Sequence, residues 1–139
     1  MLRHIALRLP FLFLVFIPTV LSAQNSVQLA AADAFVTALV ERNWERLESL
    51  EHQSLRDKIT IEQWEKLIDR LEESGGKVLR HAFHSSEMRG SFTSIVRRLH
   101  LEKDSIGLRV VVDSMNLVGG FWVDPIKREY RYLPPTYAD

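Results

Sequence analysis

The sequence contains no cysteine. This absence excludes disulfides, thiolate catalysis, cysteine-ligated zinc and a lipid-modified cysteine, so the fold must depend on packing alone. The sequence also lacks net charge, because 18 basic residues balance 18 acidic residues. Nucleic-acid binding requires a basic patch or stripe, and the interspersed charges here form none. We therefore expect no nucleic-acid partner.

A hydrophobic run long enough to span a membrane is missing as well. The most apolar segment, Leu9–Val20, has 12 residues, whereas a membrane-spanning helix needs about 20. Arg3 and Arg8 lie on its N-terminal side without any acidic residue. A positive start followed by a short apolar run is typical of a secretory signal peptide. We predict a signal peptide over residues 1–23, with a retained anchor as the alternative.

The segment Leu21-Ser22-Ala23 ends the apolar run and is the predicted cleavage region. Cleavage after Ala23 would put Leu21 at the −3 position, whereas cleavage after Ser22 would put Val20 there. Both sites stay open. The sequence therefore predicts export to the periplasm or the extracellular space, without a stable membrane anchor.

The remaining 116 residues have the length of one domain. Apolar residues recur at helical spacing up to Gly75-Gly76 and alternate after it, which predicts helices followed by strands. Asn25 or Ser26 is the expected cap of the first helix, and Thr60 begins a capping box. The expected helices cover residues 25–42, 44–55 and 61–75. The expected strands cover residues 77–88, 92–101, 106–112 and 117–123.

Short turns between consecutive strands favour antiparallel pairing, because parallel strands need long crossovers. The predicted fold class over residues 24–125 is therefore α+β, with three N-terminal helices packed on a curved four-stranded antiparallel sheet. Residues 126–139 are rich in proline and tyrosine and predict an extended tail or linker.

Three stretches carry a resemblance to a known superfamily. They are Ala31–Leu39 before Asn43-Trp44, Ile59–Trp64 before Gly75-Gly76, and Leu108–Pro125 with its Val118-Gly119-Gly120-Phe121-Trp122 segment. In this order they resemble the NTF2-like (cystatin-like) superfamily, in particular the uncharacterised domain that precedes secreted bacterial α/β-hydrolases. The resemblance implies a cone-shaped fold with room for a pocket between sheet and helices.

The resemblance also suggests what the domain does. The segment Tyr132–Asp139 resembles the linker that leads into the hydrolase, and no G-x-S-x-G nucleophile motif occurs in the chain. We expect a non-catalytic binding or association module whose partner is a second copy or an α/β-hydrolase domain. A small enzyme or small-molecule binder with a pocket of this fold is the alternative.

Two basic residues are candidates for such a pocket. Alternation places Arg97 on the same strand face as the apolar Ile95 and Leu99, and it places His81 with Leu79 and Phe83. A cation on an apolar face is costly unless a partner or ligand neutralises it. Arg97 and His81 are therefore predicted to line an anion-accepting or acid–base pocket. A β-bulge, or an arginine that extends to the sheet rim, is the alternative.

Other combinations are less favoured. His81 and His84 are three positions apart and point to opposite faces of a regular strand, so we expect no metal site and no cofactor. A His81–Asp33 or His100–Asp33 pair of dehydratase type stays open. The tryptophans at positions 44, 64 and 122 are predicted in the core, and the charged residues of 41–56 on a solvated face.

Overall fold

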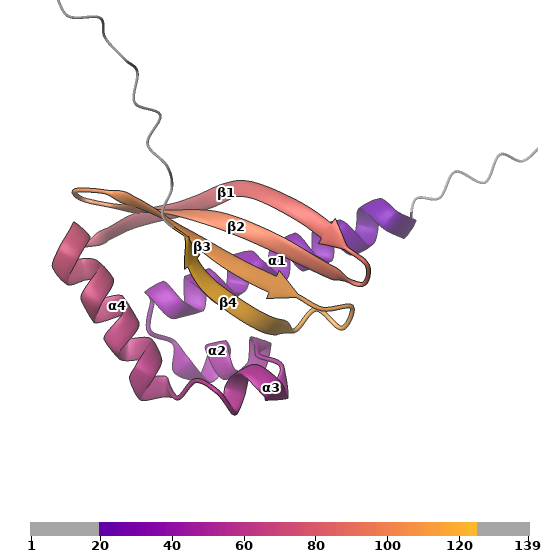
Figure 1. The fold of residues 1–139 in the computed structure, drawn as a ribbon, viewed down its shortest axis with the longest axis horizontal. Coiled ribbons are helices and arrows are strands. Elements are labelled where there is room, and N and C mark those ends of the chain that lie inside the picture. Colours follow the sequence, from indigo (N-terminus) through magenta and orange to yellow (C-terminus); the bar gives the residue numbers. More distant parts are fainter. Residues whose placement is uncertain (1–19, 125–139) are drawn as a thin grey trace, which may run out of the picture.

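The computed structural model describes residues 20–124, with side chains from Asn25 onward, and shows four helices followed by four strands. The α+β class and the four-stranded antiparallel sheet are confirmed, and each strand range agrees with the prediction to within one residue (Figure 1). The predicted leader, except its cleavage region, and the predicted tail lie outside the described residues. The helices are α1 (Val20–Val40), α2 (Trp44–Leu50), α3 (Gln53–Arg56) and α4 (Ile61–Gly75). The strands are β1 (Val78–Arg89), β2 (Phe92–Leu101), β3 (Ser105–Val112) and β4 (Val118–Asp124).

Helix α1 begins earlier than predicted. It starts at Val20, so Asn25 and Ser26 lie within the helix and do not cap it. The preceding residues Leu21, Ala23 and Gln24 favour helix, which explains the longer element. The predicted cleavage region therefore lies in the first turns of α1. No described helix is long and apolar enough to span a membrane.

The predicted helix over residues 44–55 is two helices in the structure. The chain leaves helical geometry at Glu51, whose φ of −84° and ψ of 138° are extended. Glu51 forms a parallel bridge with Val118, and the next N–H, that of His52, donates to the Val118 carbonyl at 2.8 Å. His52 then caps α3 by accepting from the Ser54 N–H. Pairing with β4 thus breaks the helix, and the count of three helices is wrong.

Helix α4 follows its sequence signals. Thr60 and Gln63 form the predicted capping box, and Gly76 ends the helix with a φ of +84°, a conformation that favours glycine. Its buried residues Trp64, Ile68 and Leu71 lie at helical spacing and join the core.

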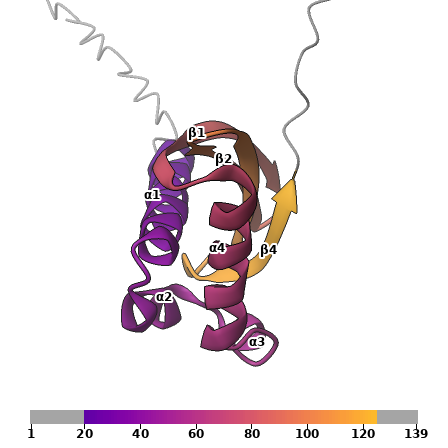
Figure 2. The ribbon, with the colours of Figure 1, turned by 90° about the vertical axis from the view of Figure 1, so that its left-hand side faces the viewer.

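The sheet has the strand order β1-β2-β3-β4, with every neighbouring pair antiparallel. Its inner face packs on the helices, with α1 running along it (Figures 1 and 2). The rings of Phe35, Trp64 and Phe121 contact one another, and the Trp64 centroid lies 5.7 Å from that of Phe35 and 4.9 Å from that of Phe121. The outer face points away from the helices. Inner-face residues at the sheet centre are Ile95, Leu99, Leu108 and Val110, all buried.

Strand β1 contains two β-bulges. The register slips between Val78 and Arg80 and again between Phe83 and Ser85, which leaves Leu79 and His84 as extra residues. Each bulge reverses the alternation of faces along the strand. The expectation that Leu79 follows the regular alternation of His81 and Phe83 is therefore wrong, because Leu79 lies in a bulge.

Candidate functional site

The structure brings the two predicted pocket residues together on the inner face. In the β1–β2 register His81 pairs with Leu99, and the next inner position of β1, Phe83, pairs with Arg97. The Arg97 Nε donates a hydrogen bond to the His81 Nδ1 over 2.9 Å. Only 9% of the Arg97 surface is exposed. The guanidinium is thus held inside the fold and does not extend to the sheet rim.

Helix α1 completes this arrangement with two polar side chains. The Asp33 Oδ1 lies 2.9 Å from the Arg97 Nη2, and the Thr37 Oγ1 lies 2.9 Å from the His81 Nε2. Asp33 and Thr37 are one turn apart and therefore lie on the same face of α1. Asp33, Thr37, His81 and Arg97 form what we call the Asp33 cluster, which ties α1 to two strands.

The hydrogen bonds of the Asp33 cluster fix the form of the histidine. Because Nδ1 of His81 accepts from Arg97, the ring carries its proton on Nε2 and donates it to Thr37. Burial, followed by the nearby Arg97 charge, lowers the pKa of His81 below its ordinary value of 6.5. The neutral ring is therefore the stable form.

This geometry leaves little room for catalysis. The lone pair that a general base needs already accepts from Arg97, and Asp33 already neutralises that guanidinium. The His81 Nδ1 and Asp33 Oδ1 are 3.8 Å apart, so the two form no direct hydrogen bond. His100 is placed elsewhere, on the outer face opposite Arg80. No group of three or more metal-binding side chains gathers within residues 25–124.

A second buried charge was missed by the sequence analysis. Glu51 is 2% exposed, and the Trp64 Nε1 donates to its Oε1 over 3.0 Å. The assignment of Glu51 to a solvated face is wrong, because the helix break turns it toward the core. Burial raises the pKa of Glu51 above 4.5, and the Trp64 hydrogen bond opposes this shift.

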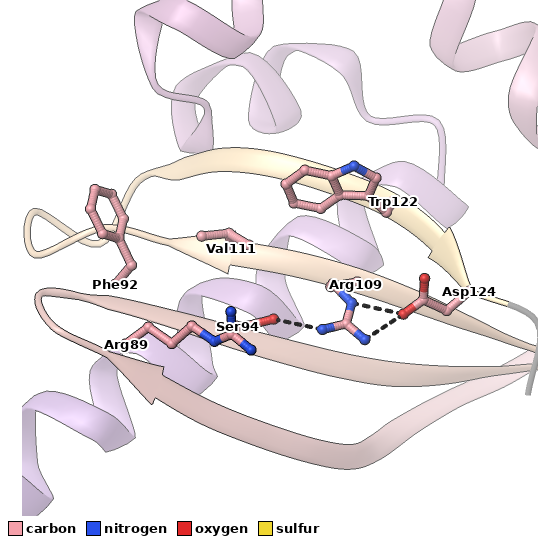
Figure 3. Close-up of a pocket in the computed structure, with 7 residues that line it drawn as sticks. All are labelled: Arg89, Phe92, Ser94, Arg109, Val111, Trp122 and Asp124. Atoms are coloured by element: carbon pink, nitrogen blue, oxygen red, sulfur yellow. Dashed lines mark hydrogen bonds and ion pairs between the residues drawn. The ribbon is translucent and has the colours of Figure 1, made fainter.

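The outer face carries a different kind of site. Trp122 is 54% exposed, so its predicted core position is wrong. Its neighbour Phe121 faces inward opposite Val110, and adjacent residues of a strand point to opposite faces. Figure 3 shows Trp122 and the half-exposed Phe92 on either side of Val111. The hollow there measures about 420 Å³ and is lined by Arg89, Phe92, Ser94, Arg109, Val111, Trp122 and Asp124.

Hydrogen bonds hold the polar wall of this hollow in place. Both the Nε and the Nη2 of Arg109 lie 2.7 Å from the Asp124 Oδ2, and its Nη1 donates to the Ser94 hydroxyl at 3.3 Å (Figure 3). The Arg109 guanidinium therefore connects β3 with β2 and β4, and these bonds fix its orientation.

Trp122 stands where three hollows meet. It also lines a hollow of about 420 Å³ beside Met115 and another of about 630 Å³ beside Leu67. A methyl group on Gly120 would come within 2.7 Å of the indole, so the ring lies against the bare backbone of this glycine. Glycine at position 120 thus leaves free the space that the indole occupies.

Charge is distributed unevenly between the outer face and the helices. The β-sheet register places four arginines but only two acidic residues on the outer face. Residues 41–75, which hold α2, α3 and α4, contain ten acidic and six basic residues. The outer-face charges are Arg80, Arg89, Arg98 and Arg109 with Glu87 and Asp124. The outer face is therefore basic, although the whole chain is neutral.

Compared with known proteins, the chain matches no family model, no curated protein and no solved structure.

Proposed function

We propose that this chain is an exported, non-catalytic association module of NTF2-like type, which binds a partner protein through the outer face of its sheet. The observation that carries the proposal is the exposed Trp122 at the junction of three hollows. Tryptophan and arginine dominate the binding energy of protein interfaces, and here Trp122 lies beside Arg109. A rigid aromatic ring among hollows is an anchor for a protein surface.

The charges of the outer face specify the partner's chemistry. Arg89 and Arg98 add positive charge around the apolar centre at Val111 and Trp122. A complementary surface offers an apolar side chain for the hollow and an acidic rim for the arginines. The resemblance found in the sequence suggests a secreted α/β-hydrolase domain as this partner, and the basic face supports an acidic docking surface on it.

The NTF2-like assignment is supported by the order of the elements. Helices come first, an antiparallel meander follows, and α1 lies along the inner face of the sheet. The Asp33 cluster supports a non-catalytic role, because its histidine lone pair and its guanidinium have partners within the fold.

A titration with isolated hydrolase domains tests the partner. Each secreted α/β-hydrolase encoded by the same genome would be titrated by calorimetry with wild-type chain, Trp122→Ala, Arg89→Glu and the control Arg46→Glu, which lies on exposed α2. We expect one hydrolase to bind, about tenfold or more weaker binding for Trp122→Ala, and unchanged binding for Arg46→Glu. Absence of binding, or binding that is indifferent to Trp122→Ala, overturns the proposal. A wild-type dimer that Trp122→Ala dissociates would assign the face to a second copy instead.

A mass measurement tests export. The intact mass of the protein recovered from the periplasm or medium should match a chain that begins at Ala23 or Gln24. A product that retains Met1 in the cytoplasmic fraction contradicts export.

A further inference from the structure

The two edges of the sheet are protected to different degrees. At the β4 edge Val118 is bridged to Glu51 and accepts from the His52 N–H. Strand β1 forms the other edge, and among its 12 residues none is buried. Edge strands present unpaired N–H and C=O groups that can pair with another strand. Leu79 and Met88 are also exposed on this edge.

The bulge at His84 gives the β1 edge a charge pattern that a regular strand could not have. Arg80 and Glu87 are seven positions apart, so on a regular strand they would point to opposite faces. In the structure Arg80 pairs with His100 and Glu87 with Ser94, which both lie on the outer face of β2. The bulge thus puts one positive and one negative side chain on the same face, on either side of His84.

We propose that β1 pairs antiparallel with β1 of a second copy of this chain, across a two-fold axis between Phe83 and His84. The four strands of each copy then form one continuous sheet. This pairing differs from outer-face binding in the surface it uses and stands independently of it.

Self-complementarity identifies a second copy as the occupant. The axis puts Arg80 opposite Glu87 of the second copy, and the symmetry repeats this contact. The small residues Ala82 and Ser85 also meet, both on the outer face. Opposite charges that face each other across paired strands are stabilising, and like charges are destabilising.

The same register also pairs the exposed apolar residues. Leu79 comes opposite Met88 of the second copy, so each copy covers two apolar side chains that are exposed in the single chain. The pair that Glu87 makes within one chain, with Arg89 at 3.3 Å, is exposed and contributes little. Arg80 forms no ion pair with another residue of 25–124, and Glu87 has only this exposed pair with Arg89.

Charge reversal tests the register directly. Light scattering on a size-exclusion column would measure the mass of wild-type chain, Arg80→Glu, Glu87→Arg, the double variant and the control Arg46→Glu. We expect dimers for wild-type and Arg46→Glu, and monomers for each single reversal, because like charges then face each other twice. The double variant should dimerise again.

Mixing the two single variants gives the sharpest result. When one variant pairs with the other, an acidic and a basic side chain face each other at both symmetry-related contacts, so an equimolar mixture should form a heterodimer. Recovery on mixing also shows that both variants are folded. A monomeric wild type, a dimer that survives Arg80→Glu, or a mixture that stays monomeric overturns the proposal. Trp122→Ala should stay dimeric, which separates this edge from outer-face binding.

Discussion

The two faces of the sheet are formed by alternate residues of the same strands, yet they have opposite characters. On the inner face, Ile95 and Val110 are fully buried against the helices, and the charge of Arg97 is neutralised by Asp33. On the outer face, Trp122 is exposed and the arginines outnumber the acidic residues. Adjacent residues such as Phe121 and Trp122 therefore serve different purposes. The inner face forms the core with the helices, and the outer face leaves an aromatic ring and several arginines exposed to solvent.

The largest expected effect lies in the aromatic centre of the inner face. Phe35 is fully buried and its ring meets those of Trp64 and Phe121. Phe35→Ala should lower the free energy of unfolding by about 3–5 kcal/mol, because a buried cavity replaces the ring. Urea unfolding followed by circular dichroism measures this loss. A loss below about 1 kcal/mol would contradict the inner face as the source of stability.

The next effect concerns the buried charge. Arg97→Met removes the guanidinium and leaves His81 without its donor, so we expect a loss of about 2 kcal/mol in the same urea assay. Asp33→Asn should cost less, because the Asp33 side chain is 55% exposed and water can solvate it. Equal losses for the two variants would contradict this order and show that the Asp33 charge contributes as much to stability as the Arg97 guanidinium.

The pH dependence of stability should distinguish the contribution of His81 from that of Glu51. The folded-state pKa of His81 lies below 6.5, so the folded protein binds fewer protons and loses stability as pH falls below 6.5. His81→Asn should reduce the dependence of stability on pH in this range. The charges that act on the pKa of His81, those of Arg97, Asp33 and Glu41, stay in place in this variant. Urea midpoints across pH 5 to 7 measure the slope. If the variant keeps the wild-type slope, groups other than His81 cause this pH dependence.

Glu51 should make stability depend on pH in the opposite direction. Its folded-state pKa lies above 4.5, so the folded protein binds more protons and loses stability as pH rises through that pKa. Glu51→Gln keeps an acceptor for the Trp64 Nε1 and removes the charge. Glu51→Gln should therefore not show this loss of stability as pH rises, and urea midpoints from pH 4 to 7 would measure it. A loss of the same size as in wild type would contradict this assignment.

The smallest effect on stability is expected at the outer face. Gly120→Ala places a methyl group 2.7 Å from the Trp122 indole, which must move into solvent. The unfolding free energy should change by less than about 1 kcal/mol, while the tryptophan emission shifts to longer wavelength. Trp122→Ala is the control, because the shift should vanish when Gly120→Ala is made in that background. An unshifted emission would mean that the indole does not rest on Gly120.

The sequence was sufficient to predict the local parts of this fold. Alternation and short turns predicted all four strands, and Thr60 and Gly76 predicted the limits of α4. Arg97 and His81 were placed correctly on the inner face, because each lies within a strand segment of regular alternation. These features depend on residues close together in the chain.

Features that depend on distant residues could not be predicted. The helix break at Glu51 requires Val118, a residue far along the chain. The bulges at Leu79 and His84 depend on the register with β2, and no residue type there indicates them. The choice between Phe121 and Trp122 for the inner face also could not be made, because two adjacent aromatic residues satisfy the pattern equally.

The hydrogen bonds of α1 have a consequence for the time course of folding. The Gln28 side chain donates to the carbonyl of Asp113, and the Thr93 hydroxyl donates to Gln28. Both bonds join α1 to residues that come much later in the chain, so they form only once β2 and the turn after β3 are in place. Contacts between residues this far apart in the chain slow folding, because a long loop must close before the contact forms.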